Sequence, residues 1–126
     1  MKVSISQELL LAIFEGAKRL YPRETILLLR GQWRKDLIVI SDLVIPPLAA
    51  HGKGFATVPI HMLPMDFSIV GTVHSHPSGN LAPSSVDLNR SFGKIIMIVA
   101  HPFTSEQNVA VYDRAGEKIK LQMTVE

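Results

Sequence analysis

The distribution of apolar residues constrains the fold of this chain more than any other feature, because only one segment has clear helical spacing. Ser6 is a favourable N-cap residue, and Glu8 places an acid in the first turn after it. The apolar positions after this cap recur three and four residues apart: Leu9, Leu10, Ile13, Ala17 and Leu20. Pro22 ends the pattern, since a proline ring cannot continue a helix and disfavours helical conformation in the residue before it. The sequence therefore predicts one amphipathic helix near the N-terminus.

The rest of the chain contains short apolar runs bounded by proline, glycine and asparagine, a pattern typical of strands and turns. Thr25 to Leu29 is predicted to be a strand buried on both faces, followed by a turn at Gly31. Residues 48–64 are predicted to form a loop with one strand over 55–58, and a short helix is predicted over 84–92. Further strands are predicted over 37–45, 67–74, 94–100, 109–113 and 119–125. This order of elements predicts an α/β (α+β) fold, in which a sheet packs against helices.

The length and the cysteine count narrow the classes of site. A chain of 126 residues is long enough for one hydrophobic core and shows no internal boundary, so a single domain over residues 1–126 is expected. Because it has no cysteine, the chain cannot build a disulfide scaffold, an iron–sulfur cluster, a thiol nucleophile or a zinc finger. Any metal ion must therefore be held by His, Asp or Glu.

Charge and hydropathy exclude further classes of function. The chain has 13 basic and 11 acidic residues and no run of five like charges, so no nucleic-acid partner is expected. The longest uninterrupted apolar run is Ile95 to Ala100, far shorter than the roughly 18 residues of a membrane helix, so no membrane association is expected. No secretory signal is visible, and a cytoplasmic location is the default expectation.

Two histidines in the middle of the chain are spaced so that they can bind one metal ion together. His74 and His76 are two residues apart, and residues at this spacing on a strand project from the same face. Pro77 cannot continue the strand, and the polar loop after it is long enough to bring Asp87 beside the two histidines. Two nitrogen ligands, one oxygen ligand and an open position are typical of a catalytic zinc site, whereas structural zinc sites are closed by four protein ligands.

Each part of this pattern also has a purely structural interpretation. A His-x-His pair alone is more often two ordinary strand or loop histidines than two ligands. The spacing of Ser84 and Asp87 fits a capping box, in which the serine hydroxyl accepts a hydrogen bond from a free amide of the first helical turn. Glu24 is equally consistent with a solvated charge beside Arg23. Considered one at a time, these features favour structural roles.

Considered together, these residues resemble the JAMM motif of the MPN+ metalloproteases, a family of zinc peptidases and deubiquitinating enzymes. The segment Tyr21 to Gly31 is also similar to the family segment in which the glutamate lies between the first helix and the first strand. Other His-x-His families fit worse, because an amidohydrolase barrel needs about 250 residues and a metallo-β-lactamase site needs an Asp-His pair where Pro77 and Ser78 stand. The residues that match the motif, with the serine ten and the aspartate thirteen positions after the first histidine, are Glu24, His74, His76, Ser84 and Asp87.

The resemblance implies a fold, a site and a reaction. The fold would be MPN/JAMM-like: a mixed, curved β-sheet flanked by a long N-terminal helix and a short helix after the His-x-His-Pro loop. His74, His76 and Asp87 would bind Zn²⁺, with one ion per chain, and Glu24 would be the general base. Ser84 would help to stabilise the oxyanion, although helix capping competes for the same hydroxyl, so its main role is left open.

The resemblance also implies a class of substrate. The family cleaves peptide or isopeptide bonds after the Gly-Gly-ended tail of ubiquitin or a ubiquitin-like protein, and strand addition would bind such an extended tail, with residues 55–61 as the candidate edge. The chain lacks a long insertion and is similar to the compact archaeal and prokaryotic members; a homodimer is also considered. Two alternatives stay open: a peptidase of the same fold that processes a sulfur-carrier protein, and a non-catalytic MPN scaffold that binds partner proteins.

Overall fold

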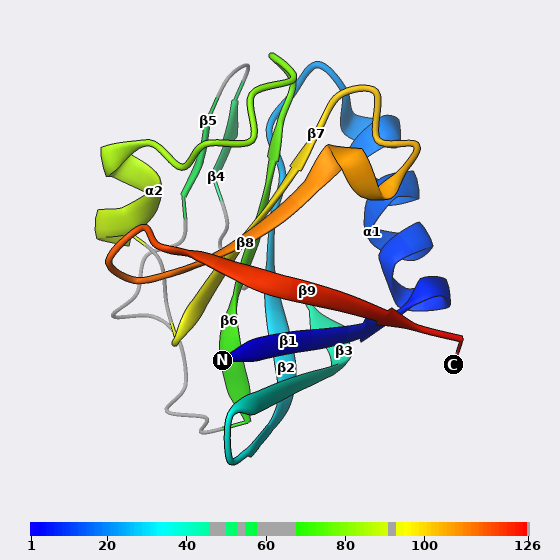
Figure 1. Cartoon of the computed structure of the whole chain (residues 1–126). Helices are drawn as coiled ribbons and strands as arrows, with labels where there is room; N and C mark the ends of the chain where they lie inside the picture. The colour runs from blue at the N-terminus through cyan, green and yellow to red at the C-terminus, as the bar shows by residue number, and fades with distance from the viewer. Residues whose placement is uncertain (46–49, 53–54, 58–67, 91–92, 126) are drawn as a thin grey trace.

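The structure, a computed structural model, describes residues 1–45, 50–52, 55–57, 68–90 and 93–125 (Figure 1). The described residues include two α-helices, α1 (Gln7–Leu20) and α2 (Ser85–Arg90), and a 3-10 helix, η2 (Glu106–Asn108). The strands, in chain order, are β1 (Lys2–Ser6), β2 (Ile26–Arg34), β3 (Leu37–Val44), β4 (Ala50–Gly52), β5 (Phe55–Thr57), β6 (Ile69–His76), β7 (Ile95–Ala100), β8 (Val109–Asp113) and β9 (Lys118–Thr124).

Among the described strands, seven form one sheet in the order β1-β3-β2-β6-β7-β8-β9, and this sheet closes on itself because β9 also pairs with β1. β1 is parallel to both β3 and β9, and β6 is parallel to β7, whereas the other ladders of the sheet are antiparallel. Figure 1 shows α1 on one side of this sheet and α2 on the other. The predicted mixed, curved sheet with its two helices is confirmed, and its curvature is strong enough to close it.

Helix α1 forms as the sequence predicts and covers part of the core. The side chain of Ser6 caps it by accepting a hydrogen bond from the backbone N–H of Leu9 at 3.1 Å. The buried face of the helix packs into the same apolar cluster as the inner side chains of the sheet and consists of Leu10, Ile13, Phe14 and Ala17. Each large side chain buried in this way contributes about 1.5–3 kcal/mol relative to leaving it exposed. Packing against the sheet, more than helix propensity, therefore holds α1 in place.

The paired strands β6 and β7 position the candidate site. Both are parallel and buried, β7 along its whole length and β6 from Ile69 to Ser75. Gly71 permits this close approach, because a Cβ there would lie 2.2 Å from the backbone oxygen of Ile95. β6 therefore lies between β2 and β7 and carries His74 and His76 at its carboxyl end.

In the first half of the chain one prediction was wrong and one strand was missed. Gly31 does not begin a turn: β2 continues through it to Arg34, with a shift of register between Arg30 and Gly31. A Cβ at Gly31 would lie 2.1 Å from the backbone oxygen of Val39, so the glycine is needed for the close approach of β3 rather than for a turn. The sequence analysis also missed β1, because its five residues run directly into α1 without a turn residue between them.

The remaining predicted elements differ mainly at their ends. β6 is longer than predicted at its carboxyl end and includes His76. α2 begins one residue later than predicted, at Ser85, and residues 91–92 of the predicted helix lie outside the described residues. The predicted loop contains a missed strand, β4, which pairs antiparallel with β5. β5 matches the predicted strand as far as residue 57, and the rest of the candidate edge at 58–61 lies outside the described residues. Within the described ranges, no helix combines the length and the apolar character needed to cross a membrane.

Candidate metal centre

The carboxyl end of β6 brings His74 and His76 to one side of the sheet. His74 is 2% exposed and lies opposite Ile26 of β2 and Ile98 of β7 in the two ladders, so neighbouring strands fix its backbone on both sides. His76 ends the strand, and Pro77 begins the turn that leaves the sheet. The predicted metal-binding pair therefore lies on a rigid strand, as its spacing indicates.

The imidazole of His76 is held by partners on both of its nitrogens. Its Nδ1 lies 2.7 Å from the backbone oxygen of Asn80, and its Nε2 lies 3.1 Å from Oδ2 of Asp87. A backbone carbonyl can only accept, so Nδ1 carries the proton and donates it to Asn80. The Asp87 carboxylate is also an acceptor, so the metal-free ring is held between two acceptors, and a cation bound at Nε2 would leave the Nδ1 proton donated to Asn80. A partner that fixes the tautomer in this way is what metal-binding histidines usually have.

The imidazole of His74 contains the feature that best tests whether this site suits a cation. Its Nε2 lies 3.3 Å from Oγ1 of Thr72. Its Nδ1 has no hydrogen-bond partner, although it is buried, and it lies 3.7 Å from Oδ1 of Asp87. With Nε2–H donated to Thr72, the lone pair of Nδ1 faces an anionic oxygen across this gap. A cation between the two atoms would satisfy both, so these residues fit a metal ion.

Asp87 and Ser84 form the capping box that the sequence indicates. The backbone N–H of Asp87 donates to Oγ of Ser84 at 3.1 Å, and the N–H of Ser84 donates to Oδ2 of Asp87 at 2.8 Å. This reciprocal pair aims the Asp87 carboxylate at the two histidines. The cap uses the hydroxyl of Ser84 only as an acceptor, and a hydroxyl can donate its proton at the same time. The cap therefore does not use the hydroxyl proton of Ser84.

Glu24 reaches the same place from the residues just before β2. It is 7% exposed, and one carboxylate oxygen of Glu24, one nitrogen of His76 and one oxygen of Asp87 all lie within 4.8 Å of one another. His74 stands outside this group of three and joins it through its 3.7 Å approach to Asp87. Glu24 and Asp87 thus lie close together, although more than sixty positions separate them in the sequence.

A serine that the sequence analysis gave no role connects the two halves of the site. Ser75 is 1% exposed, and its Oγ accepts a hydrogen bond from the backbone N–H of Thr25 at 2.7 Å. The N–H of Ser75 donates to the backbone oxygen of Thr25 at 3.0 Å. These bonds fix the residue after Glu24 against the strand that carries the histidines. Only the pairing of β2 with β6 reveals this contact, because the serine's neighbours in sequence give no sign of it.

Burial and mutual contact shift the pKa values of all four ionisable groups. Burial raises the pKa of Glu24 to about 7, with His76 opposing the rise and Asp87 adding to it. Burial also lowers the pKa of His74 to about 4. For His76, burial lowers the pKa, but its hydrogen bonds with Asp87 and Asn80 outweigh that effect and leave the pKa raised. Burial would raise the pKa of Asp87, but hydrogen bonds from His76 and the Ser84 amide bring its pKa to about 2.

These shifts decide which protonation states are present near neutral pH. Asp87 is ionised and His74 is neutral, which are the forms in which carboxylates and imidazoles bind metals. Glu24 titrates near 7 and can exchange a proton close to physiological pH, as a general acid or base must. The site therefore combines two imidazoles and a carboxylate as candidate ligands with a second carboxyl group suited to proton transfer.

Comparison with known proteins decides the family. The family model for prokaryotic homologues of the JAB domain matches residues 6–114 of the chain. The chain belongs to this family. It is also similar to a probable metalloprotease of Haloferax volcanii, with 33% identity over 122 residues, covering 91% of this chain and 75% of that relative.

Solved structures of other proteins match nearly the whole chain. A JAB1/MPN domain protein from Archaeoglobus fulgidus has 35% sequence identity and a TM-score of 0.69, covering 98% of this chain and 99% of that one. A structure described as a metalloprotease-like zinc site of the JAMM type in the proteasome and signalosome matches with the same identity, TM-score and coverage. A protein of Desulfitobacterium hafniense shares the fold at 13% identity, with a TM-score of 0.69.

Membership of the JAB family agrees with the fold that the sequence predicts. The chain has the fold of the JAMM metalloprotease-like proteins, with a candidate Glu/His/Asp metal site. All five residues that match the motif lie at or beside this site, although Ser84 enters through its contact with Asp87 and not as a candidate ligand.

Proposed function

We propose that this protein is a zinc-dependent peptidase that hydrolyses the peptide or isopeptide bond after the Gly-Gly tail of a ubiquitin-like protein. The observation that carries the proposal is the meeting of Glu24, His76 and Asp87 within 4.8 Å, next to a buried His74 nitrogen without a partner. Similarity to a probable metalloprotease and to a metalloprotease-like zinc site supports the reaction class.

The donor atoms suit zinc and leave room for a reaction. Nδ1 of His74, Nε2 of His76 and one carboxylate oxygen of Asp87 would hold the ion, which is the three-ligand donor set of catalytic zinc sites. Zinc, when bound, lowers the pKa of a water molecule toward about 7 and polarises a carbonyl group. Glu24 then takes the proton of the attacking water on its carboxylate and delivers it to the leaving amine. In the metal-free site, burial raises the pKa of Glu24 to about 7, so this carboxyl group is able to accept and release a proton.

Ser84 has a supporting role in this mechanism. Its oxygen accepts the Asp87 N–H as a helix cap, so its own proton is available to the oxyanion that forms as the carbonyl is attacked. Its side chain is exposed, as a group that contacts substrate must be. The cap and the oxyanion contact thus use different atoms of one hydroxyl group.

The substrate is the part of the proposal that rests on the resemblance to the JAMM family. An extended Gly-Gly tail would add as a strand, and the short β5, which pairs with β4 on one side, is the described part of the proposed edge. A ubiquitin-like modifier in the cytoplasm is the proposed partner. A sulfur-carrier protein with the same tail would use the same site and differs only in the group attached after the glycine pair.

The test is metal content combined with cleavage of a panel of fusion proteins. The panel joins ubiquitin-like and sulfur-carrier proteins through a Gly-Gly tail to a reporter, beside a control panel that ends in Ala-Ala. We expect about one zinc per chain and cleavage only after Gly-Gly, lost with a chelator and restored by Zn²⁺. Glu24→Ala should retain zinc and lose cleavage by about 10²–10⁴-fold, whereas Glu15→Ala, on the exposed face of α1, should not change it.

Other outcomes would contradict specific parts of the proposal. Full cleavage by Glu24→Ala would exclude the mechanism. Zinc binding without cleavage of any fusion would favour a non-catalytic scaffold. Cleavage of the sulfur-carrier fusions alone would support the proposed reaction but would show that the substrate is a sulfur-carrier protein.

A further inference from the structure

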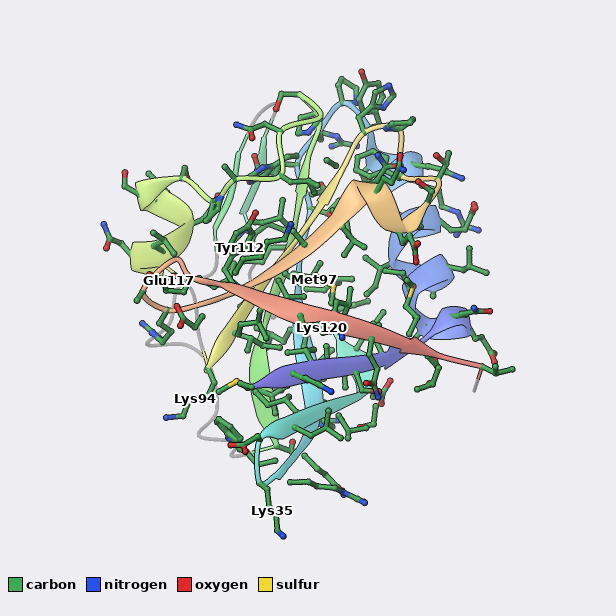
Figure 2. The ribbon with its side chains drawn as sticks, viewed as in Figure 1. Lys35, Lys94, Met97, Tyr112, Glu117 and Lys120 are labelled. Atoms are coloured by element: carbon green, nitrogen blue, oxygen red, sulfur yellow. The ribbon has the colours of Figure 1, made fainter. Side chains whose placement is uncertain are left out.

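The loop between β6 and α2 is tied to the other end of the chain by a tyrosine. Tyr112, on β8, donates a hydrogen bond from its hydroxyl to the backbone oxygen of Leu81 at 2.7 Å. The two residues are 31 positions apart, and both are partly buried. Figure 2 labels Tyr112 at the end of β8 that lies toward α2. The JAMM motif does not include this residue, and the spacing of the chain gives no sign of its contact.

Leu81 directly follows the residue that orients His76. The backbone oxygen of Asn80 accepts the Nδ1 proton of His76 at 2.7 Å, and this bond leaves Nε2 facing Asp87. Within the loop, the N–H of Gly79 reaches the His76 oxygen at 3.3 Å, and Oδ1 of Asn80 accepts from the N–H of Ala82 at 3.0 Å. These contacts hold the shape of the loop, whereas the Tyr112 hydroxyl joins it to the sheet.

β8 is paired with strands on both sides, so it can anchor the loop between β6 and α2. Tyr112 lies opposite Ile96 of β7 and Lys118 of β9, so its backbone is paired on both sides. The turn between β8 and β9 also lies against α2, since a Cβ on Gly116 would be 3.6 Å from a methyl group of Leu88. The carboxyl-terminal strands therefore support both segments that come after His76, the loop and the helix.

We propose that Tyr112 is a positioning residue of the metal centre: its hydroxyl fixes the 77–84 loop so that the Asn80 carbonyl holds the Nδ1–H of His76 and keeps Nε2 directed at Asp87 and the proposed ion. The inference rests on the metal site of the proposed function and is independent of the peptide substrate. Burial raises the pKa of Tyr112, so its hydroxyl keeps its proton and stays a donor over the physiological range. Partners of this kind, outside the ligands themselves, commonly change metal affinity by 10–100-fold when they are removed.

The test is Tyr112→Phe, which removes one oxygen and retains the ring. The dissociation constant for Zn²⁺ is measured by competition with a chromophoric chelator, and we expect it to rise about tenfold. The Nδ1–H of His76 is observed in the zinc-loaded protein by ¹H–¹⁵N spectra of the imidazole rings, and its exchange with water is measured. The wild type should show a slowly exchanging Nδ1–H, and Tyr112→Phe should show faster exchange of the same proton.

Tyr21→Phe is the matched control, because the chain has only two tyrosines. Tyr21 stacks on His101 with ring centroids 4.4 Å apart and is 44% exposed, so loss of its hydroxyl should change neither Zn²⁺ affinity nor exchange of the His76 Nδ1–H. Wild-type affinity and wild-type exchange in Tyr112→Phe would overturn the proposal. So would weaker Zn²⁺ binding with unchanged exchange, or a lower melting temperature alone, since a merely structural role would produce these. Neither readout involves peptide cleavage, so failure of the proposed function would leave this test intact.

Discussion

The core beneath α1 and the buried part of the metal centre at the carboxyl end of β6 are built from opposite kinds of side chain. The core cluster consists of aliphatic and aromatic residues from α1 and the sheet. Of the six buried polar or charged residues in the described part of the chain, five lie in or beside the metal centre: Glu24, Thr72, His74, Ser75 and Asp87. Most of the free-energy cost of burying polar groups therefore falls at the metal centre.

This difference indicates that the apolar core mainly stabilises the fold, whereas the metal centre mainly serves function. Apolar burial stabilises the fold in proportion to the area removed from water. A buried polar atom without a partner, such as Nδ1 of His74, costs free energy that a bound cation would recover. Changes in the core should therefore lower stability whether or not metal is present, whereas changes at the site should act mainly through the metal and proton transfer.

The largest expected effect on stability is in the core. Phe14, 2% exposed on α1, fills space between the helix and the sheet. Phe14→Ala should lower the free energy of unfolding by about 3–5 kcal/mol in urea titrations, because it removes apolar contact and leaves a cavity. The folded fraction should bind zinc as the wild type does. Leu11→Ala, at a 57% exposed position of the same helix, is the control and should cost about 0.5 kcal/mol or less.

Metal binding should produce the next largest effect. Free Zn²⁺ at about 100 times its dissociation constant should raise the free energy of unfolding by about 2.7 kcal/mol. Urea titrations with Zn²⁺ and with a chelator measure this difference. His74→Ala should lose it, whereas His101→Ala, at an exposed histidine outside the ligand set, should retain it. Equal stabilisation of both variants would show that His74 is not a ligand.

Ser75→Ala tests the hydrogen bond that connects Thr25, the residue after Glu24, to the strand that carries the two histidines. The change leaves the Thr25 N–H without the oxygen that accepts it at 2.7 Å, and an unsatisfied buried donor costs about 1–3 kcal/mol. We expect that loss in the metal-free protein, together with slower peptide cleavage, because Glu24 is one residue from the freed amide. Ser41→Ala, at an exposed serine, should stay within about 0.5 kcal/mol of the wild type. Equal stabilities for the two variants would contradict a structural role for Ser75.

The stability of the metal-free protein should also depend on pH. The pKa of Glu24 is raised from 4.5 to about 7 by burial, so between these values the folded state holds a proton that the unfolded state has released. The Glu24 contribution to stability therefore falls as the pH rises from about 4.5 to about 7 and is constant above that. Relative to wild type, Glu24→Gln should become more stable over this window, as followed by thermal melts in chelator. A difference independent of pH would show that Glu24 is not buried as described.

The local elements and the residue types of the site could be predicted from the sequence, because both depend on near neighbours. The N-cap at Ser6 and the three- and four-residue spacing after it place α1, and the two-residue spacing of His74 and His76 places both imidazoles on one strand. The pairing of Ser84 with Asp87 is a three-residue contact and is equally local. The family motif could be recognised for the same reason.

Only the tertiary structure decided how these pieces meet. Closure of the sheet through β1, the bond between Ser75 and Thr25, and the bond between Tyr112 and Leu81 join segments from 31 to more than a hundred residues apart. No local pattern encodes such contacts, since they depend on which strands become neighbours and in which register. The sequence by itself thus determined which side chains are available to a metal ion. The tertiary structure determined that Glu24 approaches them, and which nitrogen of His76 faces Asp87.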